Sequence, residues 1–460
     1  MVYGDYDADG VCSSVLLIEA LEKLYGVKQT RRENETDKKL ISVYLPHREE
    51  EGYGLTMRVV EYLKNQSAKL VITCDCGTGN IAELQALRDA KIDAIVLDHH
   101  LAPKTRPPAF GFINPKFEKE SYPFRELAGC GVVFKVVQGL RDYLQKKSAR
   151  PLIGESFEKW SLDLVALATV ADMMPLKQEN RIFVKWGLFV MNKLRRPGLK
   201  ALAASSRLTK RISAYDISFI LAPRINAAGR IDHANVAYDL LREMNYTNAL
   251  KDAEALAKTN EKRQKITEEI FQQARAQGDA QYKNNDRVLV AHNLEKGAWQ
   301  TGILGLVAGK LVKEFGRPAF VIGKSPHGCA GSGRSVKGFD ITALVKSVSQ
   351  LFEKSGGHSQ ACGFTFIASE SEKKLVIAFK KAAEIYAQKH LLGKDLSPVI
   401  TVDLEISFSD ISWNLIEQLE RFEPYGQENA EPVFLTRSIT VESARLVGAN
   451  QDHSKLTLSH

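Results

Sequence analysis

Cysteine is scarce in this sequence, and long apolar runs are missing from it. Its 460 residues include six cysteines, none of which forms a CxxC pair. They are too sparse for a disulfide framework in a chain of this length. No apolar run approaches the roughly 18 residues that a membrane-spanning helix needs. These absences predict a protein without membrane-embedded segments, in a reducing compartment such as the cytoplasm.

Two further absences concern targeting and charge. The first residues, MVYGD, lack the basic start and the apolar stretch of a signal peptide. Neither sign of charge dominates, since 63 Lys and Arg against 55 Asp and Glu give a net charge of +8. This mild excess permits a nucleic-acid partner without arguing strongly for one. With 44% apolar and 26% charged residues, the composition is that of a globular protein and excludes disordered or collagen-like chains.

The length is typical of three or four domains. Over residues 1–190, short apolar runs alternate with amphipathic stretches. Strands are expected at 41–45, 70–74, 94–97 and 111–114, and helices at 57–63, 81–90, 132–144 and 162–171. Near-continuous apolar strands alternating with helices predict an α/β domain with a doubly wound parallel sheet covered on both faces. Ligands of such sheets bind at the carboxyl ends of the strands.

Residues 191–285 are expected to form a helical connector. Its second part, 247–277, contains no Gly or Pro and carries an apolar stripe of helical spacing. This pattern predicts a helix on the order of 45 Å long that separates two lobes and is ended by Gly278 and Asn284-Asn285.

A second α/β domain is expected over 286–395, with strands at 288–291, 319–322, 330–334 and 363–367 and helices at 302–315 and 341–352. From 396 to 460 the pattern becomes strand-rich, with strands expected at 399–408, 432–435, 439–446 and 455–458. This region predicts a small β-barrel. Because the residues are few for five strands and the sequence stops beside a strand, we expect the barrel to be incomplete.

Acidic and histidine clusters lie where the predicted elements of the first domain end. One is GDYDADG at 4–10, Asp75 and Asp98-His99-His100 each follow a strand, and Asp172 follows an apolar helix. A single Asp in such a place usually caps a helix or closes a turn. Four clusters at one sheet edge would repel one another unless a cation neutralised them.

The types of side chain in these clusters indicate which metal they suit. Carboxylates with one or two imidazoles favour Mn²⁺ or Mg²⁺, and the absence of a Cys/His quartet argues against structural zinc. Cys74 and Cys76 alternate with Asp75 and are expected to pack in the core rather than bind metal. We therefore infer a two-metal site, in which one carboxylate bridges the ions, one ion activates water and the other stabilises the leaving oxygen.

Taken in order, the motifs resemble those of the DHH phosphoesterase superfamily and, within it, its single-strand-specific exonucleases. The resemblance covers nearly the whole chain, and although one Asp-His-His is a weak signal, the ordered set is specific. The matching segments are GDYDADG at 4–10, PHREEEGYG at 46–54, TCDCG at 73–77, LDHH at 97–100, ATVADMMPL at 168–176, PRINAAGR at 223–230, GSGRS at 331–335 and SGGHSQACGF at 355–364. The implied fold is a DHH domain, the long helix, a DHHA1 domain and an OB-like barrel.

The resemblance implies that two Mn²⁺ or Mg²⁺ ions are held by Asp5, Asp7, Asp75, His99 and Asp172. It places Asp75 as the bridge and Asp5 on the first ion, with the other three around the second. Asp9 and Asp98 are expected to orient the ligands through hydrogen bonds. His100 is expected to contact phosphate or the activated water, and an orienting role for it stays open.

Several basic and polar residues are expected to contact the substrate. The motif context favours Arg48, Arg224 and Arg230 as phosphate contacts, because the arginine fork binds phosphate at two points. Small-residue loops at 331–335 and 356–358 would let backbone N–H groups approach phosphate. The resemblance implies a clamp there for the 5′ phosphate and terminal nucleotide. The further residues expected to contact substrate are Asn226, Ser332, Arg334 and His358.

The resemblance implies 5′→3′ hydrolysis of single-stranded DNA in repair and recombination, by a monomer that works with a helicase and a single-strand-binding protein. An alternative is a DHH-family oligoribonuclease or cyclic-dinucleotide phosphodiesterase. Those relatives are shorter, so 247–277 and 398–460 argue against it. A catalytically inactive scaffold predicts missing ligands, yet all five are present. Met1 stands where some relatives have a metal-binding His, so a late start of the sequence is expected to leave the metal edge under-supported.

Overall fold

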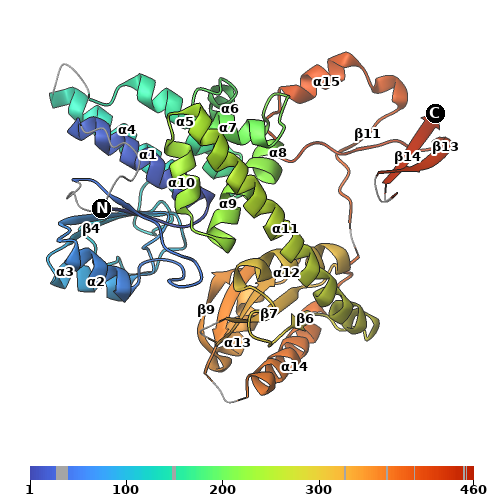
Figure 1. The fold of residues 1–460 in the computed structure, drawn as a ribbon. Coiled ribbons are helices and arrows are strands. Elements are labelled where there is room, and N and C mark those ends of the chain that lie inside the picture. The colour runs from blue at the N-terminus through green and yellow to red at the C-terminus, as the bar shows by residue number, and fades with distance from the viewer. Residues whose placement is uncertain are drawn as a thin grey trace.

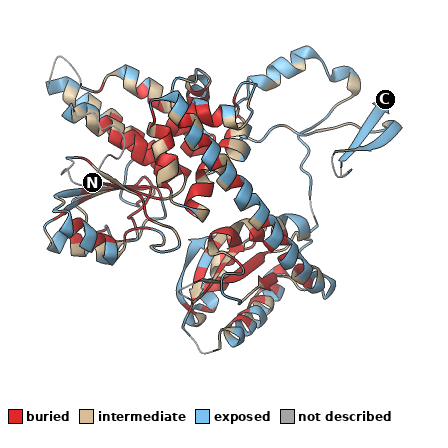
Figure 2. Ribbon diagram, in the orientation of Figure 1, coloured by how far each residue is buried: buried red, intermediate tan, exposed pale blue. Residues whose placement is uncertain are grey.

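The computed structural model describes residues 1–26, 40–147, 152–325, 328–368, 371–397, 399–448, 451 and 453–459. The described residues form two α/β bodies joined by a long helix, and a C-terminal segment stands beside them (Figure 1). Most buried residues belong to the two bodies, whereas the C-terminal segment is almost entirely exposed (Figure 2).

The first body is built on a five-stranded parallel sheet with the strand order β2-β1-β3-β4-β5. Register pairs such as Tyr3 with Thr73 and Cys74 with Leu97 align the carboxyl ends of the strands at one edge. The expected strand at 41–45 is shorter than predicted, and the other three match within one residue. The strands are β1 (Val2–Gly4), β2 (Val43–Tyr44), β3 (Leu70–Cys74), β4 (Asp93–Leu97) and β5 (Gly111–Ile113).

Helices cover both faces of this sheet, which confirms the doubly wound fold. On one face α2 (Met57–Asn65) and α3 (Ile81–Asp89) pack on a core that contains Tyr3 and Cys76. On the other face, α1 (Ala8–Tyr25), α4 (Gly129–Lys147) and α5 (Glu155–Ala171) share a core that contains Cys74. Cys74, the last residue of β3, and Cys76, beyond the turn at Asp75, are each buried in one of these cores, so both are packing residues, as predicted.

The connector is helical, as expected, and is dominated by one element. Helix α11 (Tyr246–Lys283) has 38 residues and is therefore ~57 Å long. Of the residues expected to end this helix, Asn284 is its C-cap, as predicted, whereas Gly278 does not end it. Gly278 lies buried inside α11, where a Cβ would meet the Phe315 ring at 3.1 Å, so its small size serves close packing. Before α11 come α6 (Gln178–Met191), α7 (Pro197–Ser205), α8 (Ala214–Asp216), the π-helix η1 (Ile217–Leu221), α9 (Ala222–Ile231) and α10 (Asn235–Arg242).

The second body has a five-stranded sheet of order β6-β7-β8-β10-β9, in which β6 pairs with β7 in parallel and the other pairs are antiparallel. Its strands are β6 (Leu289–His292), β7 (Ala319–Ser325), β8 (Gly328–Arg334), β9 (Phe352–His358) and β10 (Ala361–Phe366), and its helices are α12 (Thr301–Phe315), α13 (Ile341–Ser347) and α14 (Glu372–Leu391). The expected helix at 341–352 ends early, because a short 3-10 turn at Ser349–Leu351 leads directly into β9.

Two predicted loops of the second body are strands. The small residues at 331–334 lie in β8, and those at 356–358 lie in β9. Glycine is required in β8 for packing rather than for turning: a Cβ on Gly331 would lie 2.4 Å from the Phe364 ring, and one on Gly333 would lie 2.7 Å from the Phe320 ring. Strand β8 lies between β7 and β10, so the backbone groups of 331–333 face sheet partners and the predicted phosphate-binding loop is absent there. Strand β9 is an edge strand, so for 356–358 a backbone contact to phosphate stays a prediction.

The C-terminal segment forms two separate two-stranded sheets, and its described residues close no barrel. The expected strand at 399–408 is reduced to β11 (Leu404–Glu405), which pairs with β12 (Phe434–Leu435). Strands β13 (Thr440–Val447) and β14 (His453–Ser459) form a hairpin, and α15 (Trp413–Glu420) was not expected. The segment contacts the start of α6, where Arg181 donates to the carbonyl of Phe422 at 2.6 Å. Among the described helices, none is long and apolar enough to cross a bilayer.

Candidate active site

The turn between β1 and α1 places two carboxylates at the sheet edge. Asp7 caps α1, and its Oδ1 accepts hydrogen bonds from the backbone N–H groups of Asp9 and Gly10 at 2.9 and 3.0 Å. Asp5 directly follows the strand and is 4% exposed. Its Oδ1 is buried without a hydrogen-bond partner. Of the two carboxylates in the Asp-x-Asp motif, that of Asp7 is thus used as a helix cap, whereas one oxygen of Asp5 has no partner.

Asp75 lies in the turn after β3, with a left-handed backbone (φ 62°). Its N–H donates to the carbonyl of Leu97 at 2.9 Å, which holds the turn against β4. The start of α4 comes so close that a Cβ on Gly129 would lie 2.7 Å from Asp75 Cβ. Asp75 Oδ1 is buried and accepts no hydrogen bond of good geometry, although His99 Nε2 lies 3.1 Å away.

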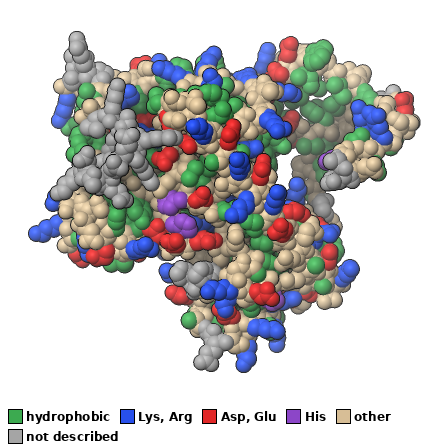
Figure 3. All heavy atoms as spheres, in the orientation of Figure 1, with side chains coloured by type: hydrophobic (Ala, Val, Ile, Leu, Met, Phe, Trp, Pro, Cys, Tyr) green, Lys and Arg blue, Asp and Glu red, His purple; other side chains and the backbone are tan. Residues whose placement is uncertain are grey.

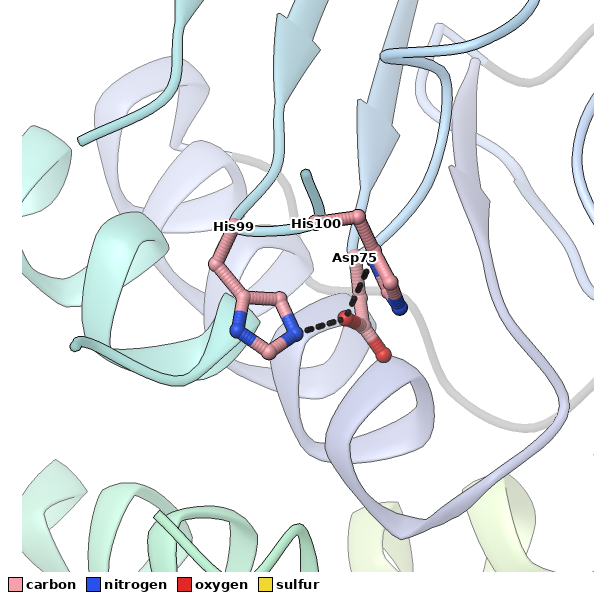
Figure 4. Close-up of side chains that lie close together, drawn as sticks. All are labelled: Asp75, His99 and His100. Carbon is pink, nitrogen blue, oxygen red and sulfur yellow. Dashed lines mark ion pairs between the residues drawn. The ribbon is translucent and has the colours of Figure 1, made fainter. Parts of the chain in front are cut away.

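The turn after β4 carries Asp98 and the two histidines that follow it, His99 and His100. Asp98 Oδ1 accepts from the N–H of His99 at 2.7 Å and lies 2.8 Å from His100 Nδ1, while Oδ2 accepts from the N–H of Thr78. Asp98 therefore shapes the loop. Both histidines approach Asp75 Oδ1, His99 through Nε2 at 3.1 Å and His100 through Nδ1 at 3.9 Å (Figure 4).

Asp9 and Asp172 complete the acidic cluster from two helices. Asp9 caps α4, because its two oxygens accept from the N–H groups of Gly129 and Cys130 at 2.6 and 2.7 Å. Asp172 follows the last residue of α5. His99 Nε2 lies 3.8 Å from an oxygen of Asp9 and 3.5 Å from one of Asp172. His99 thus faces three carboxylates.

The geometry brings all five predicted ligands together. Three overlapping groups have potential ligand atoms within 4.8 Å of one another: Asp5, Asp7 and Asp75; Asp9, His99 and Asp172; and Asp75, His99 and His100. Asp75 belongs to two of these groups. One buried oxygen of Asp5 and one of Asp75 have no hydrogen-bond partner. Together with the carboxylate and imidazole donors around them, they fit a pair of Mn²⁺ or Mg²⁺ ions.

The electrostatics of the cluster support this fit. Burial, and then the neighbouring carboxylates, raise the pKa values of Asp5, Asp75 and Asp172 well above the ordinary value, and raise the pKa of Asp9 to about 7. Burial and then the charge of His100 lower the pKa of His99 to about 3, so its imidazole is neutral and able to ligate. Divalent cations would remove the repulsion among these carboxylates.

His100 differs from His99 in the direction of its pKa shift, because its ring lies against the carboxylate of Asp98. Burial alone would lower its pKa, but the hydrogen bond and the charge of Asp98 outweigh burial and raise the pKa of His100 to about 9. Asp98 responds in the opposite sense: burial opposes its ionisation, yet His100 lowers the pKa of Asp98 below its ordinary value. The pair is therefore an imidazolium held by a carboxylate.

Arginines from both bodies gather beside the acidic edge. Arg48 lies 4.9 Å above the Tyr6 ring, and Arg230 Nη1 donates to the carbonyl of Gly302 at 2.9 Å, at the start of α12. Burial, then the charges of Arg48 and Arg263, lower the pKa of Arg230 to about 9. The pKa of Arg334 is lowered by burial, and the charge of Arg48 adds to the effect. Histidine and acidic side chains are visible together near the boundary of the two bodies (Figure 3).

Other predicted substrate contacts have partners within the protein. Asn226 Oδ1 accepts from the N–H of Ala8 at 2.7 Å and so ties α9 to the start of α1. Arg224 Nη1 donates to the carbonyl of Ile220 at 2.7 Å, and of the nearby charges only Glu261 affects its pKa, so it is not brought to the acidic cluster. Ser332 Oγ lies 3.2 Å from Arg334 Nη1.

Comparison with known proteins agrees with this architecture. Residues 1–169 match the DHH family N-terminal domain, residues 285–385 the DHHA1 domain, and residues 402–460 the RecJ OB domain. The chain is 31% identical over 462 residues to the single-stranded-DNA-specific exonuclease RecJ of Salmonella typhimurium, covering 97% of this chain and 76% of that protein. The chain belongs to the RecJ family. It is 32% identical to RecJ of Bacillus subtilis, and covers 54% of that protein's length.

RecJ structures share the fold. The structure of Thermus thermophilus RecJ in complex with Mn²⁺ matches 99% of this chain and 61% of that chain, with a TM-score of 0.81 and 28% identity. A RecJ exonuclease structure bound to manganese matches 84% of this chain and 89% of that chain, with a TM-score of 0.66 and 31% identity.

The sequence reasoning missed two residues of this RecJ-family site. Tyr53 Oη lies 2.9 Å from His100 Nδ1 and 3.3 Å from the carbonyl oxygen of Asp75. Lys116 follows β5, and its charge acts on His99, on Asp172 and on His358 of the second body. Tyr53 lies within the matched segment 46–54, and Lys116 follows a strand at the same sheet edge. Both residues could have been predicted from their positions at that edge of the sheet.

Proposed function

We propose that this chain is a metal-dependent exonuclease that degrades single-stranded DNA from its 5′ end. The observation that carries the proposal is the convergence of the five candidate ligands, with buried oxygens on Asp5 and Asp75 that accept no hydrogen bond. The names of the RecJ relatives and the metal-bound RecJ structures support the same chemistry.

The resemblance and the geometry together suggest the ligand roles. Asp75 is proposed to bridge two Mn²⁺ or Mg²⁺ ions, since it belongs to two ligand groups. The resemblance assigns Asp5 to one ion and Asp7, His99 and Asp172 to the other, whereas in the structure Asp7 groups with Asp5 and Asp75, and Asp9 is the carboxylate that groups with His99 and Asp172. Ions bound there would supply an activated water and stabilise charge on the leaving oxygen. Asp9 and Asp98 accept backbone hydrogen bonds and so hold the surrounding turns in place.

The cationic side chains are proposed to hold the strand. Charged His100 is half exposed and stands beside the acidic cluster, where it can contact a phosphate oxygen. Arg48, Arg230 and Arg334 repel one another, and a phosphate bound among them would relieve that repulsion. Because these arginines come from both bodies, a terminal phosphate bound there would orient the 5′ end. Ser332 and His358 remain proposed contacts on the second body.

The alternative activity on oligoribonucleotides or cyclic dinucleotides is not favoured, since the RecJ OB domain match at 402–460 and the RecJ relatives argue for longer single strands. We further propose a cytoplasmic monomer that meets single strands exposed by a helicase and covered by a single-strand-binding protein.

Digestion of labelled nucleic acids tests the proposal. With Mn²⁺ present, 5′-labelled single-stranded DNA should lose its label as mononucleotide from the first turnover, before 3′-labelled DNA does. Duplex DNA and short RNA should be cut far more slowly. Equal rates on duplex and single strands, or label release from the 3′ end first, would refute it. Loss of all activity in chelator and recovery with Mn²⁺ completes the test.

A further inference from the structure

An exposed pair of aromatic rings in contact with each other lies outside the metal centre. Tyr215 and Phe219 are 65% and 66% exposed, although the C-terminal segment is present. Their ring centroids are 4.6 Å apart and the planes differ by 32°. Covering either ring would remove apolar surface from water and is favourable, so these two uncovered rings form a surface suited to an apolar or aromatic ligand.

The local helix geometry aligns the two rings. Helices α8, η1 and α9 form one continuous rod over 214–231, in which η1 has π-type bonds such as the N–H of Ala222 to the carbonyl of Ile217. Pro223 has no N–H to offer the preceding turn, and the wider π turn accommodates it. Tyr215 and Phe219 are four positions apart in this rod, so their side chains lie on the same side of it, about one turn apart.

Three cationic residues lie near the pair in the sequence. Lys210 and Arg211 are exposed in the segment that leads into α8. Arg224 lies on the same rod, and its guanidinium folds back onto the carbonyl of Ile220, beside Phe219. Asp216 is the acidic residue within this stretch, and its carboxylate accepts from the N–H and hydroxyl of Ser213 in a capping box. Its charge is therefore used at the helix start.

The rod leads from the ring pair to the proposed phosphate site. Phe219 and Arg230 are eleven positions apart in it, which corresponds to roughly 16 Å along the axis. At ~3.4 Å per stacked nucleotide, that distance spans about three to five nucleotides. A strand whose 5′ phosphate lies at Arg230 can thus reach the rings with its next few bases.

We propose that Tyr215 and Phe219 are a stacking platform for nucleobases a few nucleotides 3′ of the bound 5′ end, with Lys210, Arg211 and Arg224 contacting the backbone. This rests on the proposed function and adds a second binding site to it. Single-stranded DNA is favoured over a protein partner because exposed aromatic rings with cations on the same segment match bases and phosphates, and base stacking on such rings tolerates any sequence.

A length comparison tests the platform. Binding of 5′-phosphorylated phosphorothioate oligothymidylates, which resist cleavage, is measured by fluorescence anisotropy with Mn²⁺ for lengths of 2 and 12 nucleotides. Stacking of one base is worth about 5- to 150-fold in affinity. The double variant Tyr215→Ala/Phe219→Ala should therefore lower the ratio of 12-mer to 2-mer affinity by about 10-fold or more. The double variant Tyr215→Trp/Phe219→Trp should keep the ratio.

The matched control is a second exposed aromatic pair, Trp186 and Phe189 on α6, which are 53% and 50% exposed but meet at 79°. Trp186→Ala/Phe189→Ala should leave the length ratio unchanged. An unchanged ratio in the Tyr215/Phe219 alanine variant, or an equal loss for both lengths, would overturn the platform. If cleavage of single strands is normal but the ratio is unchanged, the platform alone fails. If binding depends on the pair but no strand is cut, the proposed nuclease fails instead.

Discussion

Replacing Gly129 with alanine tests whether the position of Asp75 is set by the start of α4. An added Cβ would lie 2.7 Å from Asp75 Cβ and 2.8 Å from its Oδ1. Non-bonded carbon atoms prefer separations of about 3.5–4.0 Å, so the two groups must move apart by roughly 0.8 Å. The N–H of residue 129 stays available to Asp9, so the cap of α4 is kept.

The expected loss is larger in activity than in stability. A displacement of about 1 Å in a reacting constellation can cost about 100-fold in rate, so Gly129→Ala should lower kcat by about that factor. Overpacking should cost about 1–3 kcal/mol of unfolding free energy. Because Asp75 belongs to two ligand groups, the Mn²⁺ concentration for half-maximal activity should also rise.

The assay combines steady-state cleavage of single-stranded DNA over a Mn²⁺ titration with urea denaturation. Gly139→Ala is the matched control, because it lies in the same helix and an added Cβ would have nothing within 4 Å. That control should keep kcat and gain about 0.5–1 kcal/mol of stability. Wild-type kcat and metal dependence in Gly129→Ala would refute the reasoning that this contact positions the bridging carboxylate.

Three further predictions concern charge. Asp75→Ala should abolish turnover at any Mn²⁺ concentration without preventing folding, and residual activity at ordinary Mn²⁺ would contradict its bridging role. Arg196→Met leaves the buried carboxylate of Asp163 without its ion pair and should cost about 3–5 kcal/mol in urea unfolding, whereas Lys159→Met, at an exposed pair, should cost no more than ~1 kcal/mol. In chelator, the raised pKa of Asp9, about 7, makes the folded state hold a proton that the unfolded chain loses near pH 4. Stability of the metal-free protein should therefore fall as the pH rises from 4 to 7. A higher urea midpoint at pH 8 than at pH 5 in chelator would contradict this.

The parallel sheet and its acidic edge could be predicted from the sequence because both depend on local patterns. Apolar runs such as 70–74 are buried on both faces, and the first polar residue after each run, Asp75 or Asp98, must lie where the strand ends. Parallel pairing then brings those ends together without further information. Strand order thus accounts for the meeting of Asp5, Asp75 and His99, whereas Asp7 and Asp172 reach the same edge from the start of α1 and the end of α5.

Contacts that depend on tertiary packing could not be predicted from local sequence patterns. A glycine-rich run such as 331–334 predicts a loop if its neighbours are unknown, yet here the rings of Phe320 and Phe364 occupy the space that side chains would fill. Asn226 has the right chemistry for a substrate contact, but the folded chain places the N–H of Ala8 2.7 Å from its oxygen. A motif identifies the functional group and leaves open whether another part of the protein satisfies it first.

Tertiary packing also brings to the site an arginine that no motif indicated. Arg48 and Arg230 lie in matched motifs of the first body and the connector, whereas Arg263 lies in the polar face of α11, where sequence reasoning saw only a spacer. Packing of α9 between α11 and α12 brings Arg230 within range of the charges of both Arg48 and Arg263. A bound anion would offset such repulsion and keep the arginines charged. The long helix is therefore expected to contribute charge to the anion site as well as to set the distance between the two bodies.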